Sequence, residues 1–188
     1  MKVIQQLNSR ATQDGDGVNI SRIPGFDGKY LDPFLMIDEL KSDDHSDFMG
    51  GFPAHPHRGI ETFTYIIKGG FEHQDQMGNK KAIRAGDVQW MSTGFGVIHS
   101  EMPLADAKEG MHGFQIWLNM PSAEKLRAPR YQDTTEAPAP MTRNEQGVEL
   151  KALAGSWQFA GEQQVSSLQD LAADGVLADA TLPPVTTS

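Results

Sequence analysis

The sequence predicts an antiparallel, all-β protein of the sandwich, jelly-roll or barrel type. Nineteen glycines and eleven prolines divide the 188 residues into short apolar segments, a pattern typical of strands joined by tight turns. Within several segments, such as DVQWM and MHGFQIWLNM, apolar and polar residues alternate. That period of two indicates strands that bury one face.

The strands follow one another at short intervals. We expect them near 2–6, 17–23, 34–38, 60–67, 70–76, 81–84, 87–92, 96–102, 111–119 and 149–157. Turn signals separate them, namely GDG at 15–17, GG at 69–70, MGN at 77–79 and AGD at 85–87. Segment 60–76 is expected to form a hairpin around KGG. The alternation predicts that Trp90, Phe114, Ile116 and Leu118 belong to the core.

The pattern changes after residue 120. Residues 1–120 are expected to form one domain, 121–148 a linker rich in Pro, Ala and charge, and 149–188 a short C-terminal segment. One helical turn is expected at SAEKLR, and a helix where Val165, Leu168 and Leu171 recur at helical spacing.

Composition excludes several classes of function. The formal charge is −9 and no run of Lys or Arg is longer than KK, which disfavours nucleic acids and anionic membrane surfaces as partners. No stretch of eighteen apolar residues or of signal-peptide type occurs, so a cytoplasmic protein is expected. The absence of cysteine excludes disulfides, thiolate zinc sites, iron–sulfur clusters and cysteine nucleophiles.

Two histidines lie one residue apart in FPAHPHRGIE. If this segment is extended, His55 and His57 project from the same face. His99 and Glu101 in GFGVIHSEMP have the same spacing. Two strands that each present such a pair inward can form a sphere of three histidines and one carboxylate, which suits Fe(II), Mn, Ni, Cu or Zn. Glu61 is a rival ligand, because it shares parity with the first pair if no bulge intervenes.

The remaining histidines carry weaker signals. His73 lies in FEHQDQ between acidic residues, where a role beside a ligand and a plain exposed position are both open. His45 and His112 are interpreted as structural.

The segment FPAHPHRGIETFTYIIKGGFEHQDQMGNKKAIRAGDVQWMSTGFGVIHSEMP at 52–103 resembles the N-terminal cupin domain of the pirins. The motifs HPHRG-x-ET, EH-x-D, GDVQWM and HSEMP occur together and in order. The resemblance extends over LDPFLMIDEL and HGFQIWLN, and so covers roughly residues 1–135.

The resemblance implies a cupin-type jelly-roll β-barrel that holds one metal, usually iron. The pirin ligands correspond to His55, His57, His99 and Glu101, which favours Glu101 over Glu61. Pirins usually carry a second cupin domain, whereas about forty residues follow the linker here. We therefore expect a short C-terminal extension, read either as a truncated second domain or as strands and a helix added to the first barrel. A homodimer can substitute for the missing wall.

Two functions follow from the resemblance. One is an iron-dependent dioxygenase that cleaves flavonols such as quercetin, with Glu101 as ligand or as base. The other is an iron-containing regulator that binds protein partners according to its redox state. The acidic charge suits protein partners with basic patches better than it suits DNA.

Overall fold

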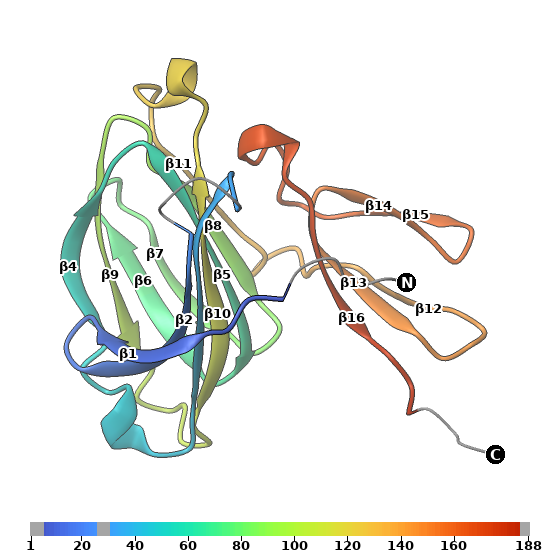
Figure 1. Cartoon of the computed structure of the whole chain (residues 1–188), viewed down its shortest axis with the longest axis horizontal. Helices are drawn as coiled ribbons and strands as arrows, with labels where there is room; N and C mark the ends of the chain where they lie inside the picture. Colours follow the sequence, from blue (N-terminus) through green and yellow to red (C-terminus); the bar gives the residue numbers. More distant parts are fainter. Residues whose placement is uncertain (1–5, 26–30, 185–188) are drawn as a thin grey trace.

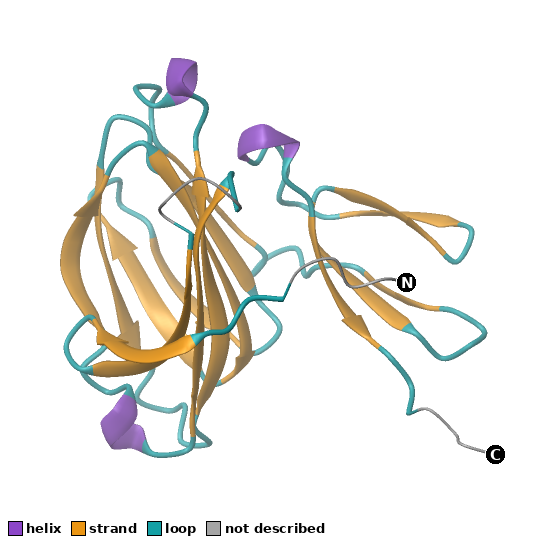
Figure 2. Ribbon diagram, in the orientation of Figure 1, coloured by secondary structure: helices purple, strands orange, loops and turns teal. Residues whose placement is uncertain are grey.

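The computed structural model describes residues 6–25 and 31–184, where β-strands predominate (Figure 2). The strands are β1 (Arg10–Asp14), β2 (Val18–Pro24), β3 (Phe34–Ser42), β4 (Phe52–His57), β5 (Ile60–Lys68), β6 (Gly70–Asp75), β7 (Lys80–Arg84), β8 (Val88–Ser92), β9 (Val97–Pro103), β10 (Met111–Asn119), β11 (Arg130–Asp133), β12 (Met141–Arg143), β13 (Glu149–Ala154), β14 (Ser156–Phe159), β15 (Glu162–Val165) and β16 (Leu177–Thr181). Short 3-10 helices lie at His45–Asp47, Ser122–Glu124 and Ala172–Asp174. The all-β prediction is confirmed. Within the described ranges, no helix has the length and apolar character needed to cross a membrane.

Two antiparallel sheets form the body of the protein (Figure 1). The large sheet has the order β1-β2-β3-β10-β5-β8-β11, and the small sheet has the order β4-β9-β6-β7. In the described part of the chain no ladder joins the two sheets, so the body is an open sandwich rather than a closed barrel. Its inner core consists of Val18, Ile20, Leu40, Phe48, Ile66, Phe71, Ile83 and Met111.

The C-terminal strands cover the outer face of the large sheet. They form a three-stranded sheet, β12-β13-β16, and a hairpin, β14-β15, beside the sandwich (Figure 1). Their side chains share a second core with the large sheet, made of Phe63, Tyr65, Val88, Trp90, Leu118, Ala139, Leu153, Ala154, Leu168 and Leu171. The Tyr65 hydroxyl also donates a hydrogen bond to the Asp179 carboxylate at 2.8 Å. The central strand β5 is therefore covered on both faces, which explains its nearly continuous apolar sequence.

Residues 60–76 do not form the expected hairpin. β5 pairs with β10 and β8 in the large sheet, whereas β6 pairs with β7 and β9 in the small one. Gly69, with φ of +80°, turns the chain from one sheet into the other, and a Cβ there would lie 2.5 Å from the carbonyl oxygen of Gly110. Because both edges of β5 are already paired, the turn becomes a crossover.

The predicted helix around residues 165–171 is also wrong. Val165 ends β15, and an irregular segment carries Leu168 and Leu171 into the outer core. The Ser166 hydroxyl donates to the Leu153 carbonyl at 2.9 Å and accepts from the Leu168 amide at 3.1 Å. These local bonds replace helical ones, and a bent extended chain satisfies the same apolar spacing.

Several strand limits differ from the sequence pattern. The strand expected at 149–157 breaks at Gly155, whose φ of +73° separates β13 from β14. The expected strands did not include β1, β4, β11, β12, β15 and β16. β11 joins the large sheet beside β8. The strand expected at 2–6 falls almost entirely outside the described residues.

Other expectations are met. The helical turn at SAEKLR appears as the 3-10 helix Ser122–Glu124. Trp90 and Leu118 are buried, and Phe114 and Ile116 pack against the outer core while partly exposed. The division into domains at 120 and 148 stays a prediction.

Candidate metal centre

The small sheet places the predicted residues on neighbouring strands. β4 lies at its edge, where the two prolines of FPAHPH are tolerated because an outer edge needs no N–H donors. His55 of β4 stands directly opposite His99 of β9, the position at which side chains of antiparallel strands meet. His57 and Glu101 follow two residues further along their strands and so share that face.

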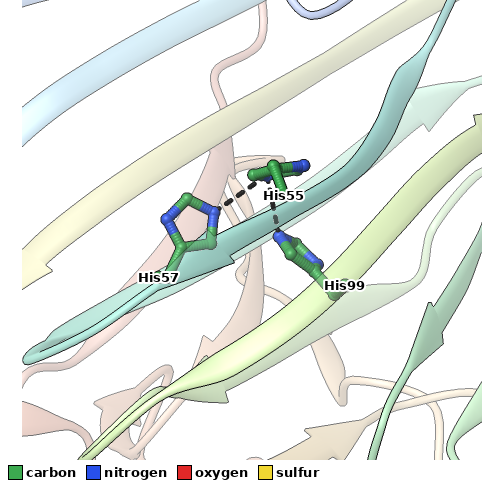
Figure 3. Close-up of side chains that lie close together, drawn as sticks. All are labelled: His55, His57 and His99. Atoms are coloured by element: carbon green, nitrogen blue, oxygen red, sulfur yellow. Dashed lines mark hydrogen bonds between the residues drawn. The ribbon is translucent and has the colours of Figure 1, made fainter.

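Three imidazoles converge between β4 and β9 (Figure 3). The Nε2 atom of His55 lies 3.0 Å from Nε2 of His57 and 3.1 Å from Nε2 of His99. The Nδ1 atom of His55 lies 2.8 Å from the carbonyl oxygen of Pro53. Only a protonated Nδ1 can donate to that carbonyl, so a neutral His55 ring has its lone pair on Nε2, the atom that faces the other two rings.

These distances fit a metal ion. Two ligand nitrogens at right angles around an ion, each about 2.1 Å from it, lie about 3.0 Å apart. The ligand nitrogens of His55, His57 and His99 all lie within 4.8 Å of one another. Three neutral nitrogens with no sulfur suit Fe, Mn, Ni, Cu or Zn rather than a thiolate zinc site.

The surroundings of His57 and His99 keep these two rings neutral. Burial, followed by repulsion from His55, lowers the pKa of His57 to about 4. Burial and repulsion from the neighbouring histidines lower the pKa of His99 to about 2. At neutral pH both imidazoles are therefore uncharged, which is the form that binds a metal.

Glu101 is a buried carboxyl group beside the histidines. It accepts hydrogen bonds from the Gln89 amide and, at 3.3 Å, from the Thr64 hydroxyl. Burial outweighs these bonds and raises the pKa of Glu101 to about 7. No lysine or arginine in the described ranges forms an ion pair with this carboxylate, so a nearby cation would stabilise its charged form.

His99 belongs to two groups of ligand-type atoms. The first contains His55 and His57, and the second contains His73 and Glu101. The four predicted residues therefore meet at His99 rather than in one compact set. His73 is fully buried, so the exposed alternative for this residue is excluded.

Glu61 lies on the opposite face of the large sheet. Its carboxylate accepts hydrogen bonds from the Trp90 indole at 2.9 Å, the Arg127 guanidinium at 2.9 Å and the Ala172 amide at 2.7 Å. Because β4 and β5 belong to different sheets, the parity that made Glu61 a rival ligand does not carry across the intervening turn.

A cavity of about 500 Å³ opens beside the histidines between the two sheets. Its lining includes His55, His57, Glu101, the aromatic residues Phe52, Phe71 and Trp117, and the acidic residues Asp14, Asp16 and Asp38. This volume lies in the usual range for small-molecule pockets, about 300–1,000 Å³. The cavity joins an apolar wall, a carboxyl group and two imidazoles, of which that of His57 is neutral.

The sequence pattern missed several polar residues around this centre. Thr64, Gln89 and Gln115 lie on strands whose other positions are largely apolar, and each points toward the inner face. A polar residue at an inward position of a buried strand was the available signal. His112 pairs with Glu39 at 3.0 Å, and His45 contacts the Lys108 carbonyl at 3.1 Å, which agrees with structural roles.

Known proteins share this architecture. The family description Pirin matches residues 18–118. A Vibrio cholerae protein named "Putative quercetin 2,3-dioxygenase" is 45% identical over 179 residues, which cover 95% of this chain and 63% of the relative. A crystal structure of quercetin 2,3-dioxygenase from Acinetobacter baumannii has a TM-score of 0.72 at 31% identity, over 87% of this chain and 58% of that one.

A metal-containing structure is also similar. The bacterial pirin YhhW from Escherichia coli in complex with nickel(II) has a TM-score of 0.51 at 27% identity, over 80% of this chain and 71% of that chain. The present chain spans between 46% and 63% of the length of the curated relatives it matches. The cupin-type fold predicted from the sequence is confirmed by these likenesses. The pirin description covers more than half of the 188 residues, and the chain therefore belongs to the pirin family.

Proposed function

We propose that the chain binds one Fe(II) ion through His55, His57, His99 and Glu101 and cleaves flavonols with O₂. The convergence of three Nε2 atoms beside a partly aromatic cavity carries this proposal. The quercetin 2,3-dioxygenase names of the relative and of the solved neighbour support it. Mn, Ni, Cu and Zn suit the same donors.

The cavity provides for substrate positioning. Phe52, Phe71 and Trp117 line it and offer apolar faces to a flat ring system. Gln115 accepts a hydrogen bond from the Thr64 hydroxyl, and Asp38 holds the Arg22 guanidinium at 2.7 and 2.8 Å. The remaining lone pairs of their oxygens can accept from hydroxyl groups of the substrate. When bound, Fe(II) supplies Lewis acidity and a redox couple for the reaction with O₂.

Glu101 is the proposed proton acceptor. Without a metal, burial raises the pKa of Glu101 to about 7. Beside a bound cation the carboxylate would be charged, and this is the form that can take the proton of a 3-hydroxyl. In the complete reaction a flavonol and O₂ give a ring-opened ester and carbon monoxide. Both atoms of O₂ enter the ester, and the hydroxyl-bearing carbon leaves as carbon monoxide with its own oxygen.

The test is anaerobic loading with Fe(II), followed by quercetin and air. We expect loss of the flavonol absorbance with release of one carbon monoxide per flavonol. A Glu101→Gln variant loaded to the same iron content should lose at least about 100-fold in kcat. Full iron occupancy without turnover, beside an active pirin control, would refute the dioxygenase proposal.

A specific surface favours a second candidate, a metal-dependent binding module for protein partners. An outer hollow lies on the far side of β4 and β9, lined by Pro56, His57, Arg58, Gln76, Phe95, Gly96, Val97 and Ile98. Phe95 is 56% exposed and Ile98 is 55% exposed. His57 lines both this hollow and the inner cavity, so an ion held by His57 can alter the outer surface.

Hydrogen exchange tests this second candidate without a known partner. The amide of Ile98 donates to Gln76 at 2.8 Å, and that of Gly96 donates to Thr93 at 2.9 Å. Loading with Fe(II) or Fe(III) should give different exchange rates at these amides if the hollow responds to the metal. Equal exchange rates in the Fe(II) and Fe(III) forms would refute the proposal that the hollow responds to the redox state of the metal.

A further inference from the structure

A second buried pair lies behind the histidine cluster. β9 is flanked by β4 on one side and by β6 on the other. In that register Asp75 of β6 stands opposite His99, and His73 stands opposite Glu101. His73 is fully buried and Asp75 is 8% exposed, so the pair is withdrawn from solvent.

Contacts orient both members of this pair. Nε2 of His73 lies 3.1 Å from Oδ2 of Asp75, and Nδ1 of His73 lies 3.5 Å from Nδ1 of His99. The ring of Tyr131 stacks on His73, with centroids 4.5 Å apart and planes inclined by 24°. The Asp75 carboxylate therefore contacts one edge of the His73 ring, and His99 lies at the other edge.

The chemistry of these atoms specifies where the protons lie. An ionised carboxylate only accepts hydrogen bonds, so Nε2 of His73 must donate to Asp75. In a neutral His73 ring, Nδ1 is then an acceptor, and the donor available beside it is the Nδ1–H of His99. A His99 ring protonated on Nδ1 has its lone pair on Nε2, the atom that faces His55.

We propose that Asp75 and His73 are positioning residues that hold the ring proton of His99 on Nδ1 and so present its Nε2 to the metal. The inference rests on the proposed metal site. It assigns a role to the EH-x-D segment that the dioxygenase proposal leaves unused. Partners of this kind orient metal-binding histidines, and their loss typically weakens metal binding about 10–100-fold.

Asp75→Asn tests the pair through its own geometry. Oδ1 of Asp75 accepts two backbone amides, from Met77 at 2.9 Å and from Asn79 at 3.1 Å. In the variant these amides keep the carbonyl oxygen of Asn at that position, which turns its NH₂ toward Nε2 of His73. The Asn79 side chain, whose amide donates to Oδ2 at 2.8 Å, then rotates to present its oxygen to this NH₂. His73 must then carry its proton on Nδ1 and donate to His99, which moves the His99 proton onto Nε2.

The direct readout is the tautomer of each ring, measured by ¹⁵N NMR on metal-free protein. In the wild type we expect His73 protonated on Nε2 and His99 protonated on Nδ1. In Asp75→Asn both patterns should reverse, and the dissociation constant for Zn(II), measured against a chelator, should rise about 10–100-fold. A wild-type His73 protonated on Nδ1 would overturn the proposal.

Two further variants separate the effect of losing this pair from the effects of a changed charge and of impaired folding. Glu72→Gln removes one negative charge from the same strand, where Glu72 pairs with Lys80 at 3.2 Å, and should bind Zn(II) as the wild type does. His73→Phe retains Asp75 and a ring against Tyr131, and should still weaken binding. Zn(II) affinities of Asp75→Asn and His73→Phe within twofold of wild type would overturn the proposal.

The same experiment distinguishes this proposal from the proposed function. If the wild type binds no metal, the metal site fails, while the metal-free tautomers still decide the role of His73 and Asp75. If Asp75→Asn does not fold, the wild-type tautomers and His73→Phe decide it instead.

Discussion

Glu61 and Glu101 are both buried carboxyl groups, but their surroundings differ. Glu61 lies on the outer face of the large sheet and receives a guanidinium, an indole N–H and a backbone amide. Glu101 lies on the inner side and receives one amide and one hydroxyl, both neutral. The chain supplies a cation to Glu61, whereas in the described ranges it supplies none to Glu101.

The difference indicates separate roles. A buried charge is tolerated when it is paired and hydrogen-bonded, and Glu61 meets both conditions. Glu101 meets only the second, and its raised pKa, about 7, records the cost of burial. Glu61 therefore fastens the C-terminal segment to the sandwich, while Glu101 remains available for a proton or a metal ion.

Glu61→Ala should have the largest effect on stability. The change leaves the Arg127 guanidinium, the Trp90 indole and the Ala172 amide without their shared acceptor, so we expect the free energy of unfolding to fall by about 3–5 kcal/mol. Urea denaturation of the metal-free protein measures this change in the free energy of unfolding. A variant with wild-type stability but no metal binding would reverse the roles assigned to the two carboxylates.

His55→Ala should affect the other region instead. Loss of a ligand should weaken Zn(II) binding by more than about 100-fold, because loss of an outer partner alone costs about 10–100-fold. His55 is only partly buried, so the free energy of unfolding of the metal-free protein should change by less than about 1 kcal/mol. Chelator competition and urea denaturation give the two values. His112→Ala is the control, because His112 lies on the large sheet against Glu39.

Glu101→Gln should stabilise the metal-free protein while weakening metal binding. The folded-state pKa, about 7, exceeds the ordinary value of 4.5, so the carboxyl contributes stability below pH 4.5 that is lost as pH rises through 7. Glutamine does not titrate, so the variant does not lose this stability as pH rises. At about pH 8 the variant should be more stable by about 1–3 kcal/mol.

Denaturation of the wild type and of Glu101→Gln across the pH range checks the direction of this change, because titrating groups remote from Glu101 cancel in the difference. Zn(II) should bind Glu101→Gln at least about tenfold more weakly. A stability difference that does not change between about pH 4 and pH 8 would show that burial does not perturb Glu101.

Arg127→Lys should have the smallest effect. Lysine keeps the positive charge near Glu61 but cannot reach Glu61, Ser92 and Glu124 together, as the guanidinium does. The free energy of unfolding should fall by about 1 kcal/mol, with metal affinity unchanged. An equal loss in Arg127→Lys and Glu61→Ala would show that the charge of Arg127 contributes little and its fork geometry nearly everything.

Local patterns predicted much of the sandwich. β8 and β10 were predicted because apolar and polar residues alternate along them. Every residue of β8 is nevertheless buried, because its polar Gln89 lies inside and donates a hydrogen bond to Glu101. The placement of β5 and β6 in different sheets could not be predicted from local patterns, because KGG suits a hairpin turn and a crossover equally. That choice depends on which strands occupy the edges of β5, and they come from distant parts of the chain.

The residues of the candidate site show the same limit: local spacing could be predicted, but contacts that depend on strand register could not. The spacing of His55, His57, His99 and Glu101 predicted which side chains share a face, and the resemblance to pirins favoured Glu101 over Glu61. Neither predicted that His73 is buried behind His99, because this depends on the register between β6 and β9. The leucines near 168 were predicted to lie on a helix, but no helix forms there because hydrogen bonds of the Ser166 hydroxyl compete with it.

The shared second core has a consequence for anyone who shortens this protein. Truncation after β11 would remove the residues that cover Phe63, Val88 and Trp90. A buried apolar interface would then become an apolar surface exposed to solvent. Such a fragment would keep every histidine of the cluster, but its exposed apolar surface would promote aggregation. Engineering of the histidine-bearing sandwich should therefore leave residues 134–184 attached, or replace the exposed apolar side chains with polar ones.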